Sequence, residues 1–174
     1  MAKIEVRPLR PEDDRSRFRS GNADLDRFFA RYAGQNQFRH HIGTTYVADD
    51  GQAIVGFVTV SASHIEIDQL PVGRRRKLPR YPLPVLRLAR LAVAQSPQGQ
   101  GIGMELLHAV FYLAHEMAAR VGCVGVVVDA KPDAVRFYGR YGFEAIETLE
   151  GALAERTRPV SMFLPLGAIL ESRS

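Results

Sequence analysis

Three glycines at alternate positions mark the stretch "VAQSPQGQGIGMELL", residues 93–107. Glycine costs about 0.5–1 kcal/mol relative to alanine in regular structure, so Gly99, Gly101 and Gly103 indicate a requirement of the backbone itself. Successive glycines let backbone N–H groups converge on an anion, and a helix that begins here adds the positive end of its dipole. Gln98 supplies a side-chain amide at the rim. The stretch therefore predicts a cradle suited to a pyrophosphate, without a metal or a lysine.

Spacing separates this anion site from other glycine-rich loops. A triphosphate loop needs G-x-x-x-x-G-K-[ST], but Met104 and Glu105 stand where Lys and Ser or Thr would follow, which excludes it. A dinucleotide fingerprint needs G-x-G-x-x-G, whereas the spacing here is G-x-G-x-G, although Asp129 does end the next predicted strand. A turn before a helix, with no ligand at all, stays open at this point.

The segments on either side of the loop predict a strand–loop–helix–strand unit. "PVLRLARLAV", residues 84–93, is typical of a strand, and "CVGVVVDA", residues 123–130, of a strand covered on both faces. Between them runs a helix that Gly122 ends. Its apolar face comprises Leu107, Val110, Phe111, Ala114, Ala118 and Val121. Such a βαβ unit places the loop at the carboxyl end of its first strand, where open α/β sheets bind ligands.

The rest of the chain predicts antiparallel strands and shorter helices. Asn22 or Asp24 would cap the first helix, and Gly34 would end it. The predicted elements are a strand at 4–9, a helix at 22–34, a hairpin at 44–62, a short helix at 132–142, and strands at 143–147 and 158–166. We therefore expect an α/β fold, with a mixed, mostly antiparallel sheet around a βαβ core and flanking helices, in a single domain of residues 1–174.

Composition restricts the class of protein. The 174 residues, 46% hydrophobic and 24% charged, are enough for one globular domain with a real core. A lone cysteine, Cys123, excludes an internal disulfide framework and fits a reducing cytoplasm. The N-terminus lacks an apolar signal region and no run approaches the length of a membrane span, so we expect a cytoplasmic protein without a membrane partner.

Positive charge is concentrated in residues 72–90 of a chain whose formal net charge is +4. Its cations are Arg74, Arg75, Arg76, Lys77, Arg80, Arg87 and Arg90. The segment could be merely solvated, or it could bind a polyanion such as RNA or an acidic partner chain. Composition alone does not separate these interpretations.

Two motifs in order make the chain resemble a known superfamily. Gln98-x-x-Gly101-x-Gly103 follows a predicted strand, and "AVRFYGRYGF", residues 134–143, follows the next one. This pattern resembles the GNAT superfamily of acetyl-CoA-dependent N-acetyltransferases over residues 86–143. The resemblance implies a GNAT fold whose βαβ core is splayed at the acetyl-CoA site. Lys131 stands where many members have Asn, so that position is assigned no role.

The resemblance also implies a set of site residues. Tyr138 matches the family's tyrosine, which protonates the departing thiolate, and a phenol with a pKa of about 10 can serve a thiol with a pKa of about 8.5. The alternative is that Tyr138 simply packs among Phe137, Tyr141 and Phe143. The implied acetyl-CoA contacts are Leu91, Ala92, Val93, Gln98, Gly99, Gln100, Gly101, Ile102, Gly103 and Met104.

The lack of a carboxylate base in the predicted strand before the glycine loop indicates which kind of amine is the acceptor. Residues 86–93 contain no carboxylate, from which an enzyme that acetylates lysine would profit, because the lysine amine has a pKa of about 10.4. An α-amine, with a pKa of about 7.7–8.0, is largely neutral at cellular pH, so an aminoacyl ester is favoured as acceptor. Asp129 could act as a base through water, but a hydrogen-bond acceptor at the strand end is the preferred interpretation.

The chain outside the two motifs resembles the toxin branch of these enzymes. That branch acetylates the α-amino group of aminoacyl-tRNA and is neutralised by a ribbon-helix-helix antitoxin. The basic segment would then bind the tRNA acceptor stem or the antitoxin, and a homodimer is a further expectation. The alternatives are an N-acetyltransferase of a small-molecule or protein amine, a non-catalytic CoA-binding protein, and a basic RNA-binding module.

Overall fold

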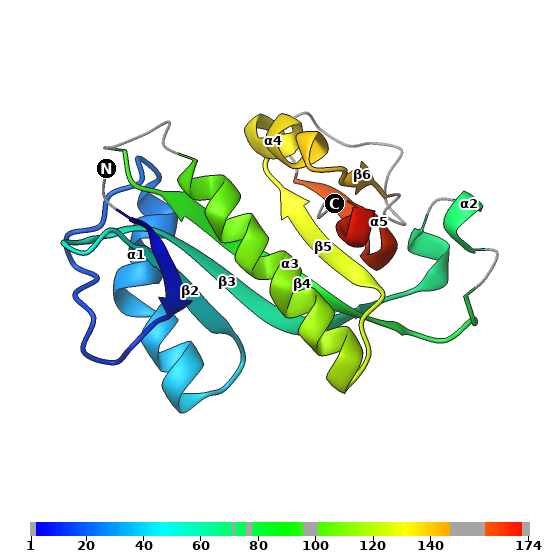
Figure 1. Cartoon of the computed structure of the whole chain (residues 1–174), viewed down its shortest axis with the longest axis horizontal. Helices are drawn as coiled ribbons and strands as arrows, with labels where there is room; N and C mark the ends of the chain where they lie inside the picture. Colours follow the sequence, from blue (N-terminus) through cyan, green and yellow to red (C-terminus); the bar gives the residue numbers. More distant parts are fainter. Residues whose placement is uncertain (1–2, 71, 76–77, 96–100, 147–158, 172–174) are drawn as a thin grey trace. The chain divides into compact units, whose positions relative to one another are not determined.

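The computed structural model describes residues 3–70, 72–75, 78–95, 101–146 and 159–171. Their strands form one seven-stranded sheet in the order β1-β2-β3-β4-β5-β7-β6 (Figure 1). The strands are β1 (Glu5–Pro8), β2 (Thr44–Asp49), β3 (Ile54–Ile65), β4 (Leu83–Val93), β5 (Gly125–Ala130), β6 (Glu144–Ala145) and β7 (Val160–Pro165). The helices are α1 (Ala23–Arg31), α2 (Val72–Arg75), α3 (Ile102–Arg120), α4 (Val135–Arg140) and α5 (Leu166–Glu171). Shorter turns are the π-helical η1 (Gln35–Arg39) and the 3₁₀ turns η2 (Ile67–Gln69) and η3 (Pro132–Ala134).

Contacts divide the chain into two compact units. Unit 1 comprises Met1–Ser61 and Leu88–Tyr112, and unit 2 comprises Ala62–Arg87 and Leu113–Ser174. The chain of β3, β4 and α3 runs from one unit into the other. Each unit has its own packing.

Unit 1 is organised by an aromatic stack between a helix and a strand. β1 pairs antiparallel with β2, and β2 with β3, through a hairpin in which Gly51 has a φ of +95°. The Asn22 side chain caps α1 by accepting from the N–H groups of residues 24 and 25. The buried Phe29 ring of α1 stacks on Phe57 of β3 with centroids 4.4 Å apart, and Phe28 lies beside it. This burial fixes α1 against the sheet.

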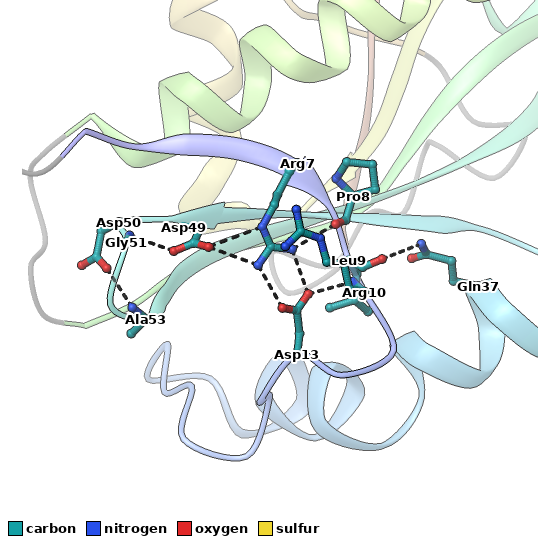
Figure 2. Close-up of polar contacts among 10 residues, drawn as sticks. All are labelled: Arg7, Pro8, Leu9, Arg10, Asp13, Gln37, Asp49, Asp50, Gly51 and Ala53. Atoms are coloured by element: carbon teal, nitrogen blue, oxygen red, sulfur yellow. Dashed lines mark hydrogen bonds and ion pairs between the residues drawn. The ribbon is translucent and has the colours of Figure 1, made fainter.

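A buried arginine ties the N-terminal strand to its neighbours. Figure 2 shows Arg7 of β1 facing two carboxylates, Asp13 of the following loop and Asp49 of β2. Both Asp13 oxygens accept from the guanidinium at 2.9 Å, and Asp49 accepts at 3.1 Å. The hydrogen bonds that Arg7 donates to Asp13 are the largest cause that raises the pKa of Arg7, and the same bonds lower the pKa of Asp13. These ion pairs hold the loop and both strands together.

Unit 2 is built around a strand with an almost entirely buried sequence. β5 pairs antiparallel with β7, which also pairs with β6. Every β5 residue is buried except Asp129. Val124 donates its N–H to the carbonyl of Pro84 at 2.8 Å, which links the start of β4 to the chain entering β5. One core cluster comprises Ile65, Leu70, Leu83, Val85, Val127, Ile146 and Phe163.

The predicted α/β class and the mostly antiparallel sheet are confirmed, and two local predictions are wrong. Gly34 does not end helical structure, because it has helical φ and ψ values and η1 follows it directly. Its missing Cβ instead leaves room for the Arg15 guanidinium, whose nearest nitrogen would lie 2.7 Å from a Cβ. Val121 does not share the buried face of α3: the helix ends at Arg120 and Val121 is 80% exposed.

Candidate active site

The described part of the glycine loop begins at Gly101, directly before α3. Gly101 has a φ of +72°, a conformation that favours glycine, and its carbonyl accepts from the N–H of Glu105 at 3.0 Å. The first N–H groups of a helix have no acceptor within it, so those of Ile102, Gly103 and Met104 are available to an anion. Gln98, Gly99 and Gln100 lie outside the described residues, and their predicted cofactor contacts stay predictions.

A glycine that the sequence analysis did not single out brings α3 close to the sheet. A Cβ on Gly56 of β3 would lie 2.9 Å from Ile102 Cγ2, 3.1 Å from Leu106 Cδ1 and 3.2 Å from the Ala92 carbonyl oxygen. Ile102 and Leu106 are therefore buried against bare backbone, next to the end of β4. The signal was a glycine inside an apolar strand, which often marks a close approach of another element.

The end of β4 is fixed by pairing that continues past the strand. Ala92 is buried, whereas Leu91 and Val93 are half-buried. Beyond them, Ala94 donates its N–H to the carbonyl of Val55 at 2.8 Å, and Gln95 donates to that of Arg19 at 2.9 Å. This pairing holds the predicted thioester-binding residues in a defined backbone. Met104, on the first turn of α3, is 38% exposed.

Tyr138 lies in α4 of unit 2 and is only 5% exposed. Its ring meets Phe137 and Phe143 edge to face, at centroid distances of 5.2 and 5.4 Å, so the predicted aromatic cluster is confirmed. Among the described residues its hydroxyl has no hydrogen-bond partner. Burial raises the pKa of Tyr138 above its ordinary value, so the hydroxyl keeps its proton at neutral pH. A buried phenol of this kind can act as a proton donor.

Asp129, for which a role as base was the less favoured interpretation, is already engaged with neighbouring side chains. Asp129 accepts from Arg87 at 3.0 Å and from the Ser161 hydroxyl at 2.8 Å. This confirms the interpretation of Asp129 as a hydrogen-bond acceptor near the end of its strand. In the ranges that the structure describes, no group of three or more His, Cys, Asp or Glu side chains could hold a metal ion.

Members of the predicted RNA-binding set have different surroundings. Arg74 of α2 pairs with Glu144 at 3.1 Å, and both side chains are about half exposed. Arg90 lies 3.8 Å above the Phe28 ring, and partial burial lowers its pKa. Arg80 is exposed. Arg75 lies in α2, and Arg76 and Lys77 fall outside the described residues, so a role in RNA binding stays a prediction for the whole set.

These features define a class of enzyme. In unit 1, a helix entered through a left-handed glycine beside the end of β4 suits the phosphates of a thioester cofactor. In unit 2, a proton-bearing tyrosine after β5 suits the protonation step of acyl transfer. The family model for the acetyltransferase (GNAT) domain matches residues 41–145, more than half of the chain. The chain belongs to this family.

Individual proteins resemble this chain over most of its length. It is 31% identical over 143 residues to a tRNA-acetylating toxin of Mycobacterium tuberculosis (strain ATCC 25618 / H37Rv), covering 82% of this chain and 85% of the relative. It matches the fold of AtaT complexed with acetyl-methionyl-tRNAfMet with a TM-score of 0.85, at 23% identity over 99% of this chain and 100% of that one.

A second AtaT structure is that of a variant with a tyrosine replaced by phenylalanine, bound to the C-terminus of the antitoxin AtaR and to acetyl-CoA. It matches with a TM-score of 0.78, at 22% identity over 98% of this chain and 97% of that one. At these identities the two structures establish the fold alone. In the described part of the chain, no helix is both long and apolar enough to cross a membrane.

Proposed function

We propose that this protein is an acetyl-CoA-dependent N-acetyltransferase toxin that acetylates the α-amino group of aminoacyl-tRNA and so blocks translation. The observation that carries the proposal is the 31% identity to a tRNA-acetylating toxin across 82% of the chain. The enzyme acts in the cytoplasm, where aminoacyl-tRNA is found. Residues 1–174 form a single acetyltransferase domain, since the family model includes residues of both units.

Acetyl-CoA fits the residues at the start of α3. Gly101 opens the helix with a backbone that other residues rarely adopt, and Gly56 lets its first turn approach β3 and the end of β4. The N–H groups of Ile102, Gly103 and Met104 bind the pyrophosphate, together with the loop residues Gln98, Gly99, Gln100 and Gly101. The N–H groups of residues 91–93 hold the thioester end.

The reaction requires one bond to form and one to break. When bound, acetyl-CoA supplies an acetyl group activated as a thioester. The backbone of residues 91–93 stabilises negative charge on the carbonyl oxygen while the amine nitrogen forms its new C–N bond. Tyr138 donates its hydroxyl proton to sulfur as the C–S bond breaks. It regains a proton from solvent, which has taken the one lost by the amine.

Two kinds of partner are proposed besides the tRNA. One is a ribbon-helix-helix antitoxin that neutralises the enzyme, in keeping with the antitoxin-bound structure of AtaT. The other is a second copy of the chain, with which the enzyme forms a homodimer.

The tRNA acceptor stem binds to the basic segment, which includes Arg74, Arg75, Arg76, Lys77, Arg80 and Arg90.

The proposal is tested by following free thiol release from acetyl-CoA with a panel of acceptors. We expect turnover with purified aminoacyl-tRNA and none with deacylated tRNA, because the latter lacks the amine. Expression of the chain alone should arrest growth. Turnover of lysine peptides or polyamines in place of aminoacyl-tRNA would overturn the assigned substrate while leaving the acetyltransferase class intact.

A further inference from the structure

A row of polar side chains crosses four strands of unit 2. Arg87 of β4 donates to Asp129 of β5 at 3.0 Å and, through Nε, to the Ser63 hydroxyl of β3 at 3.4 Å. The Ser161 hydroxyl of β7 donates to the other oxygen of Asp129 at 2.8 Å. We call Ser63, Arg87, Asp129 and Ser161 the polar row.

The polar row lies at the edge of the core cluster of unit 2. On each of the four strands, the residue two positions from the member of the polar row belongs to the core cluster. These residues are, in strand order, Ile65, Val85, Val127 and Phe163. Alternate residues of a strand share one face, so row and cluster lie on the same face of the sheet. The buried part of this face ends at the row, where the side chain of Asp129 is 55% exposed and that of Arg87 is 32% exposed. Asp129 is the one exposed residue of β5, a strand described in full.

Asp129 is held in place but can accept further hydrogen bonds. Each of its two oxygens accepts one hydrogen bond within the row, whereas an ionised carboxylate has about four acceptor positions. Contacts from two neighbouring strands fix both oxygens, so a donor arriving from solvent meets an oriented carboxylate. An ion pair within the chain that is this exposed adds little stability to the fold.

The position of Asp129 in the chain relates it to the proposed chemistry. It is the second-last residue of β5, and the next two elements are η3 and α4, which carries Tyr138. Figure 1 shows α4 beyond the carboxyl end of β5, both within unit 2. An α-amine donates N–H groups, for which a fixed carboxylate is a strong hydrogen-bond acceptor, and β4 contains no carboxylate.

We propose that Asp129, oriented by Arg87 and Ser161, accepts a hydrogen bond from the α-amine of the aminoacyl ester. It thereby selects aminoacyl-tRNA over deacylated tRNA. This inference rests on the proposed function. Arg87 serves as a positioning residue for Asp129 and not as a phosphate contact. The carboxylate recognises the amine alone, so it contributes to binding of aminoacyl-tRNA and not to binding of the deacylated form.

Steady-state kinetics of Asp129→Asn test this assignment. The KM for aminoacyl-tRNA should rise by about 10- to 100-fold, as expected for loss of a charged hydrogen bond. The inhibition constant of deacylated tRNA and the KM for acetyl-CoA should stay within a factor of two of wild type. Asp133→Asn, which removes a carboxylate from η3, is the matched control and should behave as wild type.

Three results would contradict the inference. An unchanged KM for aminoacyl-tRNA in Asp129→Asn overturns it while leaving the proposed function standing. Equal losses for deacylated tRNA and acetyl-CoA would assign the polar row to the fold alone. A wild type that does not acetylate aminoacyl-tRNA overturns the proposed function, and this inference with it. If Asp129→Asn does not fold, Asp129→Glu keeps the charge but displaces it, and should raise only the KM for aminoacyl-tRNA.

Discussion

The proton on Tyr138 is the feature of a single residue on which the proposed mechanism depends. The residue is 5% exposed and its ring packs on Phe137 and Phe143, and no described residue forms a hydrogen bond with its hydroxyl. Aromatic packing and proton donation were alternatives on sequence grounds, but in the fold they support each other. Burial by the cluster raises the pKa, and the raised pKa keeps the proton on oxygen.

Replacing Tyr138 by phenylalanine should lower kcat by about 100- to 10,000-fold, as expected for loss of a general acid. The KM for acetyl-CoA should change little, and thermal stability should be retained, because the hydroxyl has no partner among the described residues. Tyr141→Phe, which alters the tyrosine that packs on Phe137, is the matched control and should keep wild-type kcat. Equal losses in both variants would assign Tyr138 to packing.

The pH dependence of kcat should also reflect the raised pKa of Tyr138. An acid with a pKa above the ordinary value of about 10 stays protonated through pH 9.5. We therefore expect kcat of the wild type to show no falling limb between pH 8 and pH 9.5, with the enzyme's fold checked by circular dichroism. A decline centred below pH 9 would indicate that another group supplies the proton.

At the scale of elements, the Arg7 ion pairs join β1, β2 and the loop after β1 (Figure 2). Asp13→Asn should destabilise the protein by about 2–3 kcal/mol at pH 6, since it weakens two charge-assisted hydrogen bonds to a buried guanidinium. The pKa of Asp13 is lower when folded than the value of about 3.9 when unfolded, so its contribution is present above pH 4 and lost below.

Urea unfolding at pH 6 and pH 3 measures this contribution. The wild type should lose more stability than Asp13→Asn on going to pH 3, because the variant has no carboxylate to protonate at this position. Glu12→Gln, at an exposed neighbouring residue, should follow the wild-type curve. Parallel losses in wild type and Asp13→Asn would contradict the assignment.

The contact between Gly56 and α3 relates an element's position to cofactor binding. In Gly56→Ala the new Cβ would meet the Ala92 carbonyl oxygen at 3.2 Å and the Ile102 side chain at 2.9 Å. The first turn of α3 must then move, which should cost about 1–3 kcal/mol and raise the KM for acetyl-CoA more than it lowers kcat. Gly167→Ala, where a Cβ meets nothing within 4 Å, should leave both parameters unchanged.

The sequence predicted those elements whose cause is local. The apolar runs of β5 and α3 and the Asn22 cap follow from spacing along the chain, and each is present. The sequence did not explain why glycine stands at positions 34 and 56, because each glycine makes room for a side chain distant in sequence. That side chain is Arg15 for Gly34 and Ile102 for Gly56. Likewise, pairing of Arg87 with Asp129 requires the strand order, which no spacing rule supplies.

At the scale of the whole molecule, a net charge of +4 and a pI near 9.5 suit the proposed binding of tRNA. Arg7, Arg74 and Arg87 each pair with carboxylates that are already counted in this net charge. The pairs leave the net charge unchanged but hold three of the 23 Lys and Arg side chains on partners within the protein, so the cations that contact tRNA are a subset whose location can be tested.

Charge reversal within the basic segment should weaken tRNA binding in a salt-dependent way. Each phosphate contact contributes a slope of about 0.7–0.9 to the decline of log affinity with log salt concentration. The double variant Arg75→Glu/Arg76→Glu should therefore reduce the salt slope of kcat/KM for aminoacyl-tRNA by about 1–2, and leave the KM for acetyl-CoA unchanged. Arg17→Glu/Arg120→Glu changes the net charge equally, at side chains that are 92% and 79% exposed. If both double variants alter the slope alike, net charge and not a defined surface attracts the tRNA; a change confined to the first pair places the acceptor stem along residues 72–90.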